Sequence, residues 1–180
     1  MYDVIPAWVD GQLAPVDKMG VHRRGLRHLA VSVFVLQGDR VLIQQRAAGK
    51  YHTPLLWANT CCTHPLWGET DHDCAIRRLD EELGINGLAL QSIGTVEYRA
   101  HVGNGLTEHE VVRIFVGHAT ERLILCPNPD EVAATRWVAV SVLAEEVARS
   151  PDQFTPWLRI YLAEHRDMIF APASLAELRG

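Results

Sequence analysis

The chain has 180 residues, of which 48% are apolar, and its 22 acidic and 17 basic residues give a formal net charge of −5. This composition predicts one soluble globular domain over residues 1–180, and the acidic balance argues against a nucleic acid as partner. The sequence has neither a run of about eighteen apolar residues nor a basic segment followed by an apolar stretch at its start. It therefore predicts a cytoplasmic protein without a membrane span or a secretory signal.

The first third of the chain alternates between strand and loop patterns. Residues 2–16 predict a hairpin around the Asp10-Gly11 turn. The β-branched run LAVSVFVL predicts a buried strand at Leu29–Leu36, and RVLIQQR predicts its partner at Arg40–Arg46. The intervening segments, Met19–His28 and Ala47–Leu56, are predicted to be loops.

The stretch Asn59–Gly84 is the densest in chemically active side chains, and its second half predicts one helix. Ala75, Ile76, Leu79 and Leu83 are expected to share the buried face, with Thr70 or Asp71 as the N-cap and Gly84 as the stop. Arg78 and Glu82 lie one turn apart on the opposite face. Because Cys62, His64 and Glu69 come just before this helix, we expect them to meet a helix carboxylate near its N-terminus. That position suits a metal ion and an anion such as phosphate.

The four cysteines do not form a disulfide pattern, since they comprise one adjacent pair and two scattered residues: Cys61, Cys62, Cys74 and Cys126. A cytosolic chain keeps such thiols reduced, and the absence of a CxxC motif argues against a structural zinc knuckle. Nine histidines, five of them between His22 and His72, permit a metal site without proving one.

Further strands and then helices follow the central helix. Strands are predicted at Leu88–Ala100, Glu108–Ala119 and within Glu131–Val140, with a turn at Val102–Thr107 and a possible sheet extension at Leu123–Cys126. Helices are predicted from a Ser141 cap to about Arg149 and over Pro156–Phe170, and the tail Ala171–Gly180 is predicted to be a short or frayed helix. This order predicts an α+β fold, a mixed sheet with helices packed on its faces.

The stretch Asn59–Gly84 resembles the Nudix superfamily. Glu69 matches the first glutamate of the Nudix pattern, and RRLDEELGI at Arg77–Ile85 matches the rest. Thr63 replaces the leading glycine, and Arg78 replaces a glutamate that is a key acidic residue of the hydrolases. A cation at that position is expected to weaken hydrolytic metal binding and to favour an anion.

More narrowly, the chain resembles the type I isopentenyl-diphosphate isomerases over most of its length. The matching pieces, in order, are His22 with RHLAVSVFVL, QQRAAGK, NTCCTHP with GE, RRLDEELG, EYRA, EHE and FTPW. The resemblance implies a small-molecule substrate, isopentenyl diphosphate, whose double bond is moved by protonation and deprotonation through a carbocation, as a step of isoprenoid biosynthesis. It also implies a Nudix-like fold, and we expect a monomer or a dimer.

The resemblance implies a metal cluster made of His22, His28, His64, Glu108 and Glu110, which suits Mn²⁺, Zn²⁺ or Mg²⁺. Alternation along a strand puts the two glutamates on one face. Taken one at a time, His22 and His28 could each be a histidine in a loop with no role as a metal ligand. Glu82 resembles the ligand of a second ion, a Mg²⁺ that arrives with the diphosphate.

Cys62 and Glu110 resemble the two proton-transfer groups, and Tyr98 is expected to hydrogen-bond the Glu110 carboxylate. Cys61 is the competing thiol, but in an extended segment it points away from Cys62. Which of Cys62 and Glu110 acts first stays open, because their titrations would be coupled.

Arg46, Lys50 and Arg78 are expected to neutralise the phosphate oxygens, and Trp157 to face the carbocation, with a purely core role for this tryptophan equally compatible. Two alternatives remain. A Nudix hydrolase would keep a glutamate at position 78, and a non-catalytic metal- or diphosphate-binding module would tolerate loss of Cys62 or of the Glu110 charge.

Overall fold

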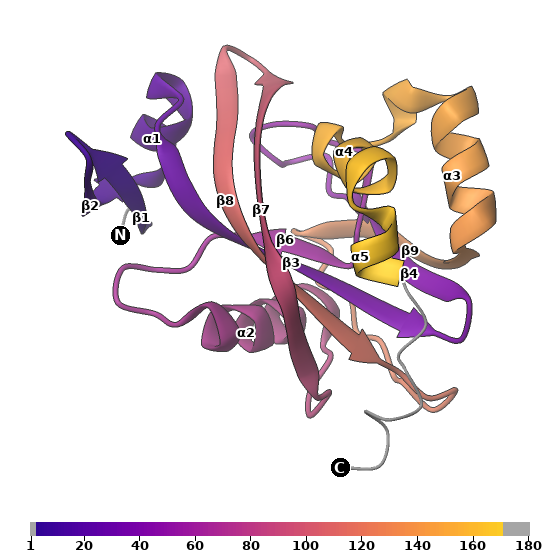
Figure 1. Ribbon diagram of the computed structural model, residues 1–180. Coiled ribbons are helices and arrows are strands. Elements are labelled where there is room, and N and C mark those ends of the chain that lie inside the picture. The colour runs from indigo at the N-terminus through magenta and orange to yellow at the C-terminus, as the bar shows by residue number, and fades with distance from the viewer. Residues whose placement is uncertain (1–2, 171–180) are drawn as a thin grey trace.

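A computed structural model describes residues 3–170 of the chain (Figure 1). Its strands and helices, in chain order, are β1 (Val4–Val9), β2 (Gln12–Asp17), α1 (Lys18–Arg24), β3 (Arg27–Gln37), β4 (Arg40–Arg46), β5 (Trp57–Ala58), β6 (Cys61–Thr63), α2 (Asp71–Leu83), β7 (Leu90–Gly103), β8 (Leu106–His118), β9 (Val132–Ala139), α3 (Val140–Arg149), the short 3₁₀ helix η1 (Pro151–Gln153), α4 (Pro156–Glu164) and α5 (Arg166–Phe170). None of these helices is long and apolar enough to cross a membrane.

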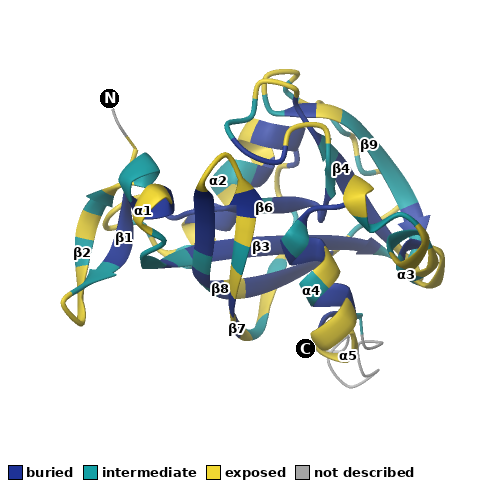
Figure 2. Cartoon of the chain, turned by 90° about the horizontal axis from the view of Figure 1, so that it is seen from above, coloured by how far each residue is buried: buried dark blue, intermediate teal, exposed yellow. Residues whose placement is uncertain are grey.

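The sheet is mixed and is organised around β3. This strand runs parallel to β8 and antiparallel to β6, and it turns directly into β4. The remaining strands add to these, β7 to β8, β9 and β5 to β4, and the β1–β2 hairpin to the start of β3. Figure 2 shows β3, β6 and β8 as largely buried, whereas β2 is partly exposed along its length.

Helices cover both faces of this sheet, α2 on one side and α3, α4 and α5 on the other (Figure 1). Successive β3 residues alternate between two apolar cores, because strand side chains point to opposite faces. Val33 and Val35 pack on the α2 side, and Phe34 packs on the α4 side. The mixed sheet with helices on its faces confirms the predicted α+β fold class.

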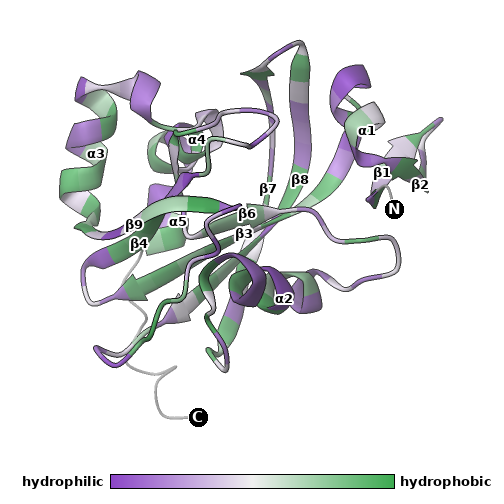
Figure 3. Cartoon of the chain, turned by 180° about the vertical axis from the view of Figure 1, so that it is seen from behind, coloured by the Kyte–Doolittle hydropathy of each residue, from purple (hydrophilic) through white to green (hydrophobic). Residues whose placement is uncertain are grey.

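Helix α2 confirms the predicted boundaries. The Thr70 hydroxyl accepts a hydrogen bond from the amide of Asp73 at 3.1 Å, and Gly84 ends the helix in a left-handed conformation at φ 66°. A side chain at Gly84 would also meet the Cβ atom of Cys126 at 2.7 Å, so glycine is required both for conformation and for space. Three of the four predicted apolar residues are buried, but Ile76 is 41% exposed, so its placement on the buried face was wrong. Figure 3 shows hydrophilic residues on the outward side of α2.

The segment Met19–His28, predicted to be a loop, contains most of helix α1 and the start of β3. The Asp17 carboxylate accepts from the amide of Gly20 at 2.7 Å, and Gly25 ends the helix at φ 60°. The sequence did not predict this short helix, because KMGVHRRG contains an internal glycine and glycine has poor intrinsic helix propensity. His22 is therefore held on a capped helix and not on a loop.

Three predictions in the C-terminal half were wrong or incomplete. Leu123–Cys126 forms no strand in the described chain, because the Cys126 amide donates to the Leu83 carbonyl at the end of α2. Helix α3 starts after Ala139 without a side-chain cap, so Ser141 does not cap it. The helix predicted over Pro156–Phe170 is interrupted at His165, which separates α4 from α5. The predicted tail helix, residues 171–180, lies outside the described residues.

Candidate active site

Three histidines and two glutamates from separate elements meet at one end of the sheet. His22 comes from α1, His28 from β3, His64 from the segment after β6, and Glu108 and Glu110 from β8. The parallel register of β3 and β8 places His28 directly beside Glu110. The Nε2 atom of His64 lies 3.2 Å from that of His28 and 2.9 Å from a carboxylate oxygen of Glu110. The sequence-predicted cluster is therefore assembled in space, and all of its members are buried.

The ring nitrogens of His22 and His28 are arranged as they are in metal ligands, whereas the Nδ1 atom of His64 has no hydrogen-bond partner among the described residues. The Nδ1 atoms of His22 and His28 lie 2.6 and 2.7 Å from backbone carbonyl oxygens, which fixes each ring and directs its Nε2 atom into the cluster. The buried Nε2 atom of His22 has no hydrogen-bond partner among the described residues. Burial lowers the pKa of His22, and burial together with neighbouring positive charges holds the pKa of His64 well below its usual value. At His28 burial is outweighed by the hydrogen bond and the charge of Glu110, so the pKa of His28 is raised. Three imidazoles beside two carboxylates fit a divalent cation, which each imidazole binds in its neutral form.

The two glutamates share one hydrogen-bond donor. The hydroxyl of Tyr98 donates to Glu110 at 2.5 Å and lies 3.2 Å from an oxygen of Glu108, which confirms that both carboxylates project from the same face of β8. Burial opposes ionisation of Glu110, but hydrogen bonds and the charge of His28 outweigh it and hold the pKa of Glu110 below its usual value. Burial raises the pKa of Tyr98 well above its usual value, so its hydroxyl stays a donor.

The thiol of Cys62 faces the same cavity as Glu110, and Cys61 faces away. In the antiparallel pair of β6 and β3, Cys62 lies opposite Ser32, and Cys61 lies opposite Val33 in the core beneath α2. The Cys62 sulfur is 3.1 Å from the Ser32 hydroxyl. Burial, reinforced by the nearby carboxylates, raises the pKa of Cys62 well above its usual value, so this thiol is protonated at neutral pH.

Four positively charged side chains also line this cavity, and we call the part that they line its cationic end. They are Lys18, Arg46, Lys50 and Arg78, and Trp157 lines the wall beside them. The guanidinium of Arg46 lies 5.3 Å from the centre of the Trp157 ring. Trp157 also belongs to the apolar core, so both of its expected roles are compatible with its position. The free volume is only about 40 Å³, room for roughly three water molecules.

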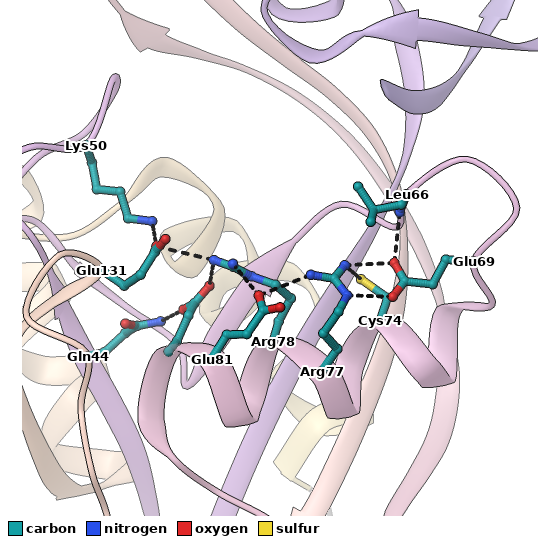
Figure 4. Close-up of polar contacts among 10 residues, drawn as sticks. Gln44, Lys50, Leu66, Glu69, Cys74, Arg77, Arg78, Glu81 and Glu131 are labelled. Atoms are coloured by element: carbon teal, nitrogen blue, oxygen red, sulfur yellow. Dashed lines mark hydrogen bonds and ion pairs between the residues drawn. The ribbon is translucent and has the colours of Figure 1, made fainter. Parts of the chain in front are cut away.

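Two of these four cations, Lys50 and Arg78, already have acidic partners. Figure 4 shows Glu131 between Lys50 and Arg78, forming an ion pair with each. Arg78 also donates to Glu82 at 2.6 Å, and Glu82 accepts from the Gln44 amide at 2.8 Å. The two residues predicted to lie one turn apart therefore bind each other. The carboxylates of Glu82 and Glu131 offset two of the four positive charges, and an arriving anion would compete with these carboxylates.

One expectation about the site is wrong. The cavity is bordered by the last two turns of α2, through Arg78 and Glu82, and not by its N-terminus. Glu69, near that N-terminus, instead accepts from the Arg77 guanidinium and, at 2.8 Å, from the amide of Leu66 (Figure 4). It therefore fastens the loop to the helix and does not join Cys62 and His64.

Sequence reasoning missed four cavity residues. Lys18 begins α1, Tyr51 and His52 lie in the segment that follows β4, and Thr63 ends β6; all four line the cavity. The Nε2 atom of His52 is 3.0 Å from an oxygen of Glu108. The one available signal was its inclusion in the histidine-rich first part of the chain, because no metal-binding spacing contains it.

Comparisons with known proteins agree with this geometry. Residues 26–158 match the NUDIX domain family. The chain is 64% identical to "Isopentenyl-diphosphate Delta-isomerase" of Cereibacter sphaeroides (strain ATCC 17029 / ATH 2.4.9) over 94% of this chain and 96% of that protein. It is 58% identical to the protein of the same name from Rhodobacter capsulatus, over 96% and 98% of the two chains. The chain belongs to the isopentenyl-diphosphate Delta-isomerase family of the Nudix superfamily.

Solved structures support the fold of this isomerase family member independently of sequence. DR0079 from Deinococcus radiodurans superposes with a TM-score of 0.65 at 13% identity, covering 82% of this chain and 90% of that chain. At this identity the likeness shows the Nudix fold alone. The predicted family and fold class are therefore confirmed.

Proposed function

We propose that the protein isomerises isopentenyl diphosphate to dimethylallyl diphosphate, a step of isoprenoid biosynthesis. The observation that carries this proposal is the position of the Cys62 thiol in the same cavity as the Glu110 carboxylate. The names of the relatives support the same reaction. The substrate is a small molecule, the protein acts in the cytoplasm, and we expect a monomer or a dimer.

The reaction needs two proton-transfer groups on one small apolar chain. The terminal alkene carbon gains a proton, a tertiary carbocation forms, and a proton leaves the carbon two positions away, so that no atom is gained or lost in total. Cys62 and Glu110 are the residues that carry these protons, in an order that the structure leaves open. Tyr98 orients Glu110 through its hydrogen bond and keeps its second oxygen occupied.

An acid strong enough to protonate an alkene has to be kept from water, because water would also trap the carbocation. The full burial of Glu110 and the partial burial of Cys62 supply that condition. Trp157 presents an aromatic wall, and a ring face attracts a cation by up to about 2 kcal/mol when the pair is desolvated. These residues therefore combine exclusion of water with stabilisation of positive charge.

The five clustered ligands would hold a divalent cation, with Mn²⁺, Zn²⁺ and Mg²⁺ all compatible with three imidazoles and two carboxylates. A bound ion would supply positive charge that makes a proton on the cluster carboxylates more acidic. His22 and His28 contribute rings already fixed by backbone carbonyls, so they bind without further ordering.

The diphosphate would be held at the cationic end of the cavity by Arg46, Lys50 and Arg78, joined by Lys18. Glu82 is placed among these groups and would bind a Mg²⁺ that accompanies the phosphates. A five-carbon chain exceeds the present free volume, so binding also requires cavity side chains to move. Exchange of the Glu131 carboxylate for phosphate oxygens at Lys50 and Arg78 would provide such a movement.

Incubation with isopentenyl diphosphate and Mg²⁺ in D₂O tests this proposal. We expect dimethylallyl diphosphate to form with deuterium incorporated, and deuterium to appear in recovered substrate, when both pools are followed by mass spectrometry. Release of inorganic phosphate without deuterium uptake would identify a Nudix hydrolase instead. Binding without either change would identify a non-catalytic module.

A further inference from the structure

His52 lies against the metal cluster, although none of the motifs matched in this sequence contains it. Its side chain is nearly fully buried, and its Nε2 atom is 3.0 Å from the Glu108 oxygen that also faces His22. We propose that His52 supplies a fourth imidazole ligand, which completes a six-donor set for one divalent ion. This inference rests on the metal centre of the proposed function and adds a ligand to it.

The spacing of the donor atoms supports direct coordination. Six ligands at about 2.1 Å from one ion place neighbouring donors about 3.0 Å apart. The separations in the structure are 3.2 Å between His28 and His64, 2.9 Å between His64 and Glu110, and 3.0 Å between His52 and Glu108. His28 lies 3.6 Å from Glu110, and His22 lies 3.8 Å from Glu108. The contact of His52 with a carboxylate is therefore shorter than those of His22 and His28. The candidate donors of His22, His52 and Glu108 lie within 4.8 Å of one another.

The other ring nitrogen of His52 has the support that metal-bound histidines need. Its Nδ1 atom lies 2.9 Å from the hydroxyl oxygen of Thr53, which can accept a hydrogen bond from the Nδ1–H group. This tautomer leaves the lone pair on Nε2, the atom that faces the cluster. His22 and His28 are anchored in the same way, through Nδ1 to a carbonyl oxygen.

The backbone around His52 is held in an unfavourable conformation. Thr53 has a φ of 44° and Leu55 a φ of 61°, values that non-glycine residues avoid and that are least favourable for a β-branched residue. Such strain persists only where the surroundings determine it, commonly at functional sites. Here the His52 carbonyl accepts a hydrogen bond from the Arg46 guanidinium at 3.2 Å. The turn therefore directs His52 inward and joins it to a residue of the cationic end.

Two roles other than metal coordination would also explain a buried histidine at position 52. In the first, the ring serves packing alone, since it lies at right angles to Tyr51 and Trp157, with ring centres 4.3 and 5.9 Å away. In the second, the Nε2–H group donates a hydrogen bond to Glu108 and only orients that ligand. A decisive experiment therefore has to count metal-bound imidazoles and not only measure activity.

Proton NMR of the full-length protein loaded with Co²⁺ gives this count. Each imidazole bound through Nε2 shows one exchangeable Nδ1 proton shifted far outside the normal range by the paramagnetic ion. We expect such protons from His22, His28, His52 and His64 in the wild type. The His52→Gln variant should lose one of them, whereas the control His72→Gln, at an exposed position on α2, should keep all.

Affinity for Mn²⁺ separates coordination from packing. His52→Phe keeps the aromatic contacts but has no ring nitrogen, so we expect both variants of His52 to bind Mn²⁺ at least tenfold more weakly than wild type. Wild-type affinity in His52→Phe would overturn the proposal. So would a wild-type spectrum with only three shifted ring protons, even if His52→Gln binds Mn²⁺ weakly, because His52 would then act through Glu108.

Failure of the His52 proposal can be distinguished from failure of the proposed function. A wild-type protein that binds no Co²⁺ would refute the metal centre itself, and absence of deuterium uptake would refute the isomerisation. If His52→Gln does not fold, the wild-type proton count still decides between four ligating imidazoles and three.

Discussion

Replacement of Arg78 by glutamine tests the cationic end of the site. Arg78 lies between three carboxylates, bound to Glu81 at 2.7 Å, to Glu82 at 2.6 Å and to Glu131 at 3.2 Å. Glu82 is the partner that matters most for stability, because its side chain is only 4% exposed, against 44% for Glu81. The variant leaves Glu82 with the single neutral donor of Gln44.

The expected loss in free energy of unfolding follows from the exposed fractions of these side chains. Removing one partner of a buried ion pair destabilises a protein by roughly 3–5 kcal/mol, whereas an exposed pair contributes about 1 kcal/mol or less. Since Arg78 is itself 19% exposed, we expect a loss near the lower limit, about 3 kcal/mol in free energy of unfolding. That corresponds to a decrease in Tm of roughly 6–12 °C for a chain of this size.

Substrate binding should weaken as well. Loss of one charge-assisted hydrogen bond to the diphosphate, worth about 1.5–3 kcal/mol, predicts a KM raised roughly tenfold to a hundredfold. Circular dichroism gives Tm, and the isomerase assay gives KM. The matched control is Arg77→Gln on the same helix, whose guanidinium points to Glu69 and away from the cavity (Figure 4). We expect it to lower Tm and to leave KM unchanged. An unchanged KM in Arg78→Gln, or an equal rise in both variants, would refute the assignment of Arg78 to the diphosphate.

Three further predictions follow from the site and from its supporting contacts. Cys62→Ala should lose turnover by at least a hundredfold and still bind the substrate by calorimetry, and retention of near wild-type turnover would rule out this thiol as a proton carrier. Tyr98→Phe should reduce kcat about tenfold or more with little effect on KM, because its hydroxyl orients Glu110 and does not line the diphosphate end. The hydrogen bond from Arg77 lowers the pKa of Glu69 from its ordinary 4.5, so this stabilisation is complete above pH 4.5 and is lost as the pH falls further. Urea unfolding from pH 7 to pH 3 should then show a smaller loss of stability below pH 4.5 for Glu69→Gln than for wild type, and parallel curves would contradict this.

The sequence predicted those parts of the site whose spacing follows from local geometry. Alternation on a strand was enough to place Glu108 and Glu110 on one face, and to separate Cys61 from Cys62. Cap residues and a glycine stop were enough to define α2. Family motifs supplied the remaining members of the cluster, which come from elements far apart in the chain.

The features that were missed depend on contacts that no local pattern encodes. His52 reaches the cluster through a turn with positive φ at Thr53, a conformation that its sequence does not favour. Leu123–Cys126 has a strand-like apolar composition, but the amide of Cys126 is taken by the end of α2. Glu69 matches a Nudix motif position, yet which side of α2 borders the cavity depends on how that helix packs against β3 and β6.

The pairing of β6 with β3 decides which sulfur reaches the cavity. Amide hydrogen bonds from the Asn59 side chain to the carbonyls of Val33 and Cys61, at 3.1 and 2.9 Å, hold this short strand in place. Removing a single residue just before Cys61 would shift the strand by one position, sending one thiol into the apolar layer under α2 and bringing its neighbour out. The register of β6, odd or even by one residue, therefore decides which thiol can take part in proton transfer. In the register of the structure, Cys61 cannot replace Cys62 if Cys62 is lost.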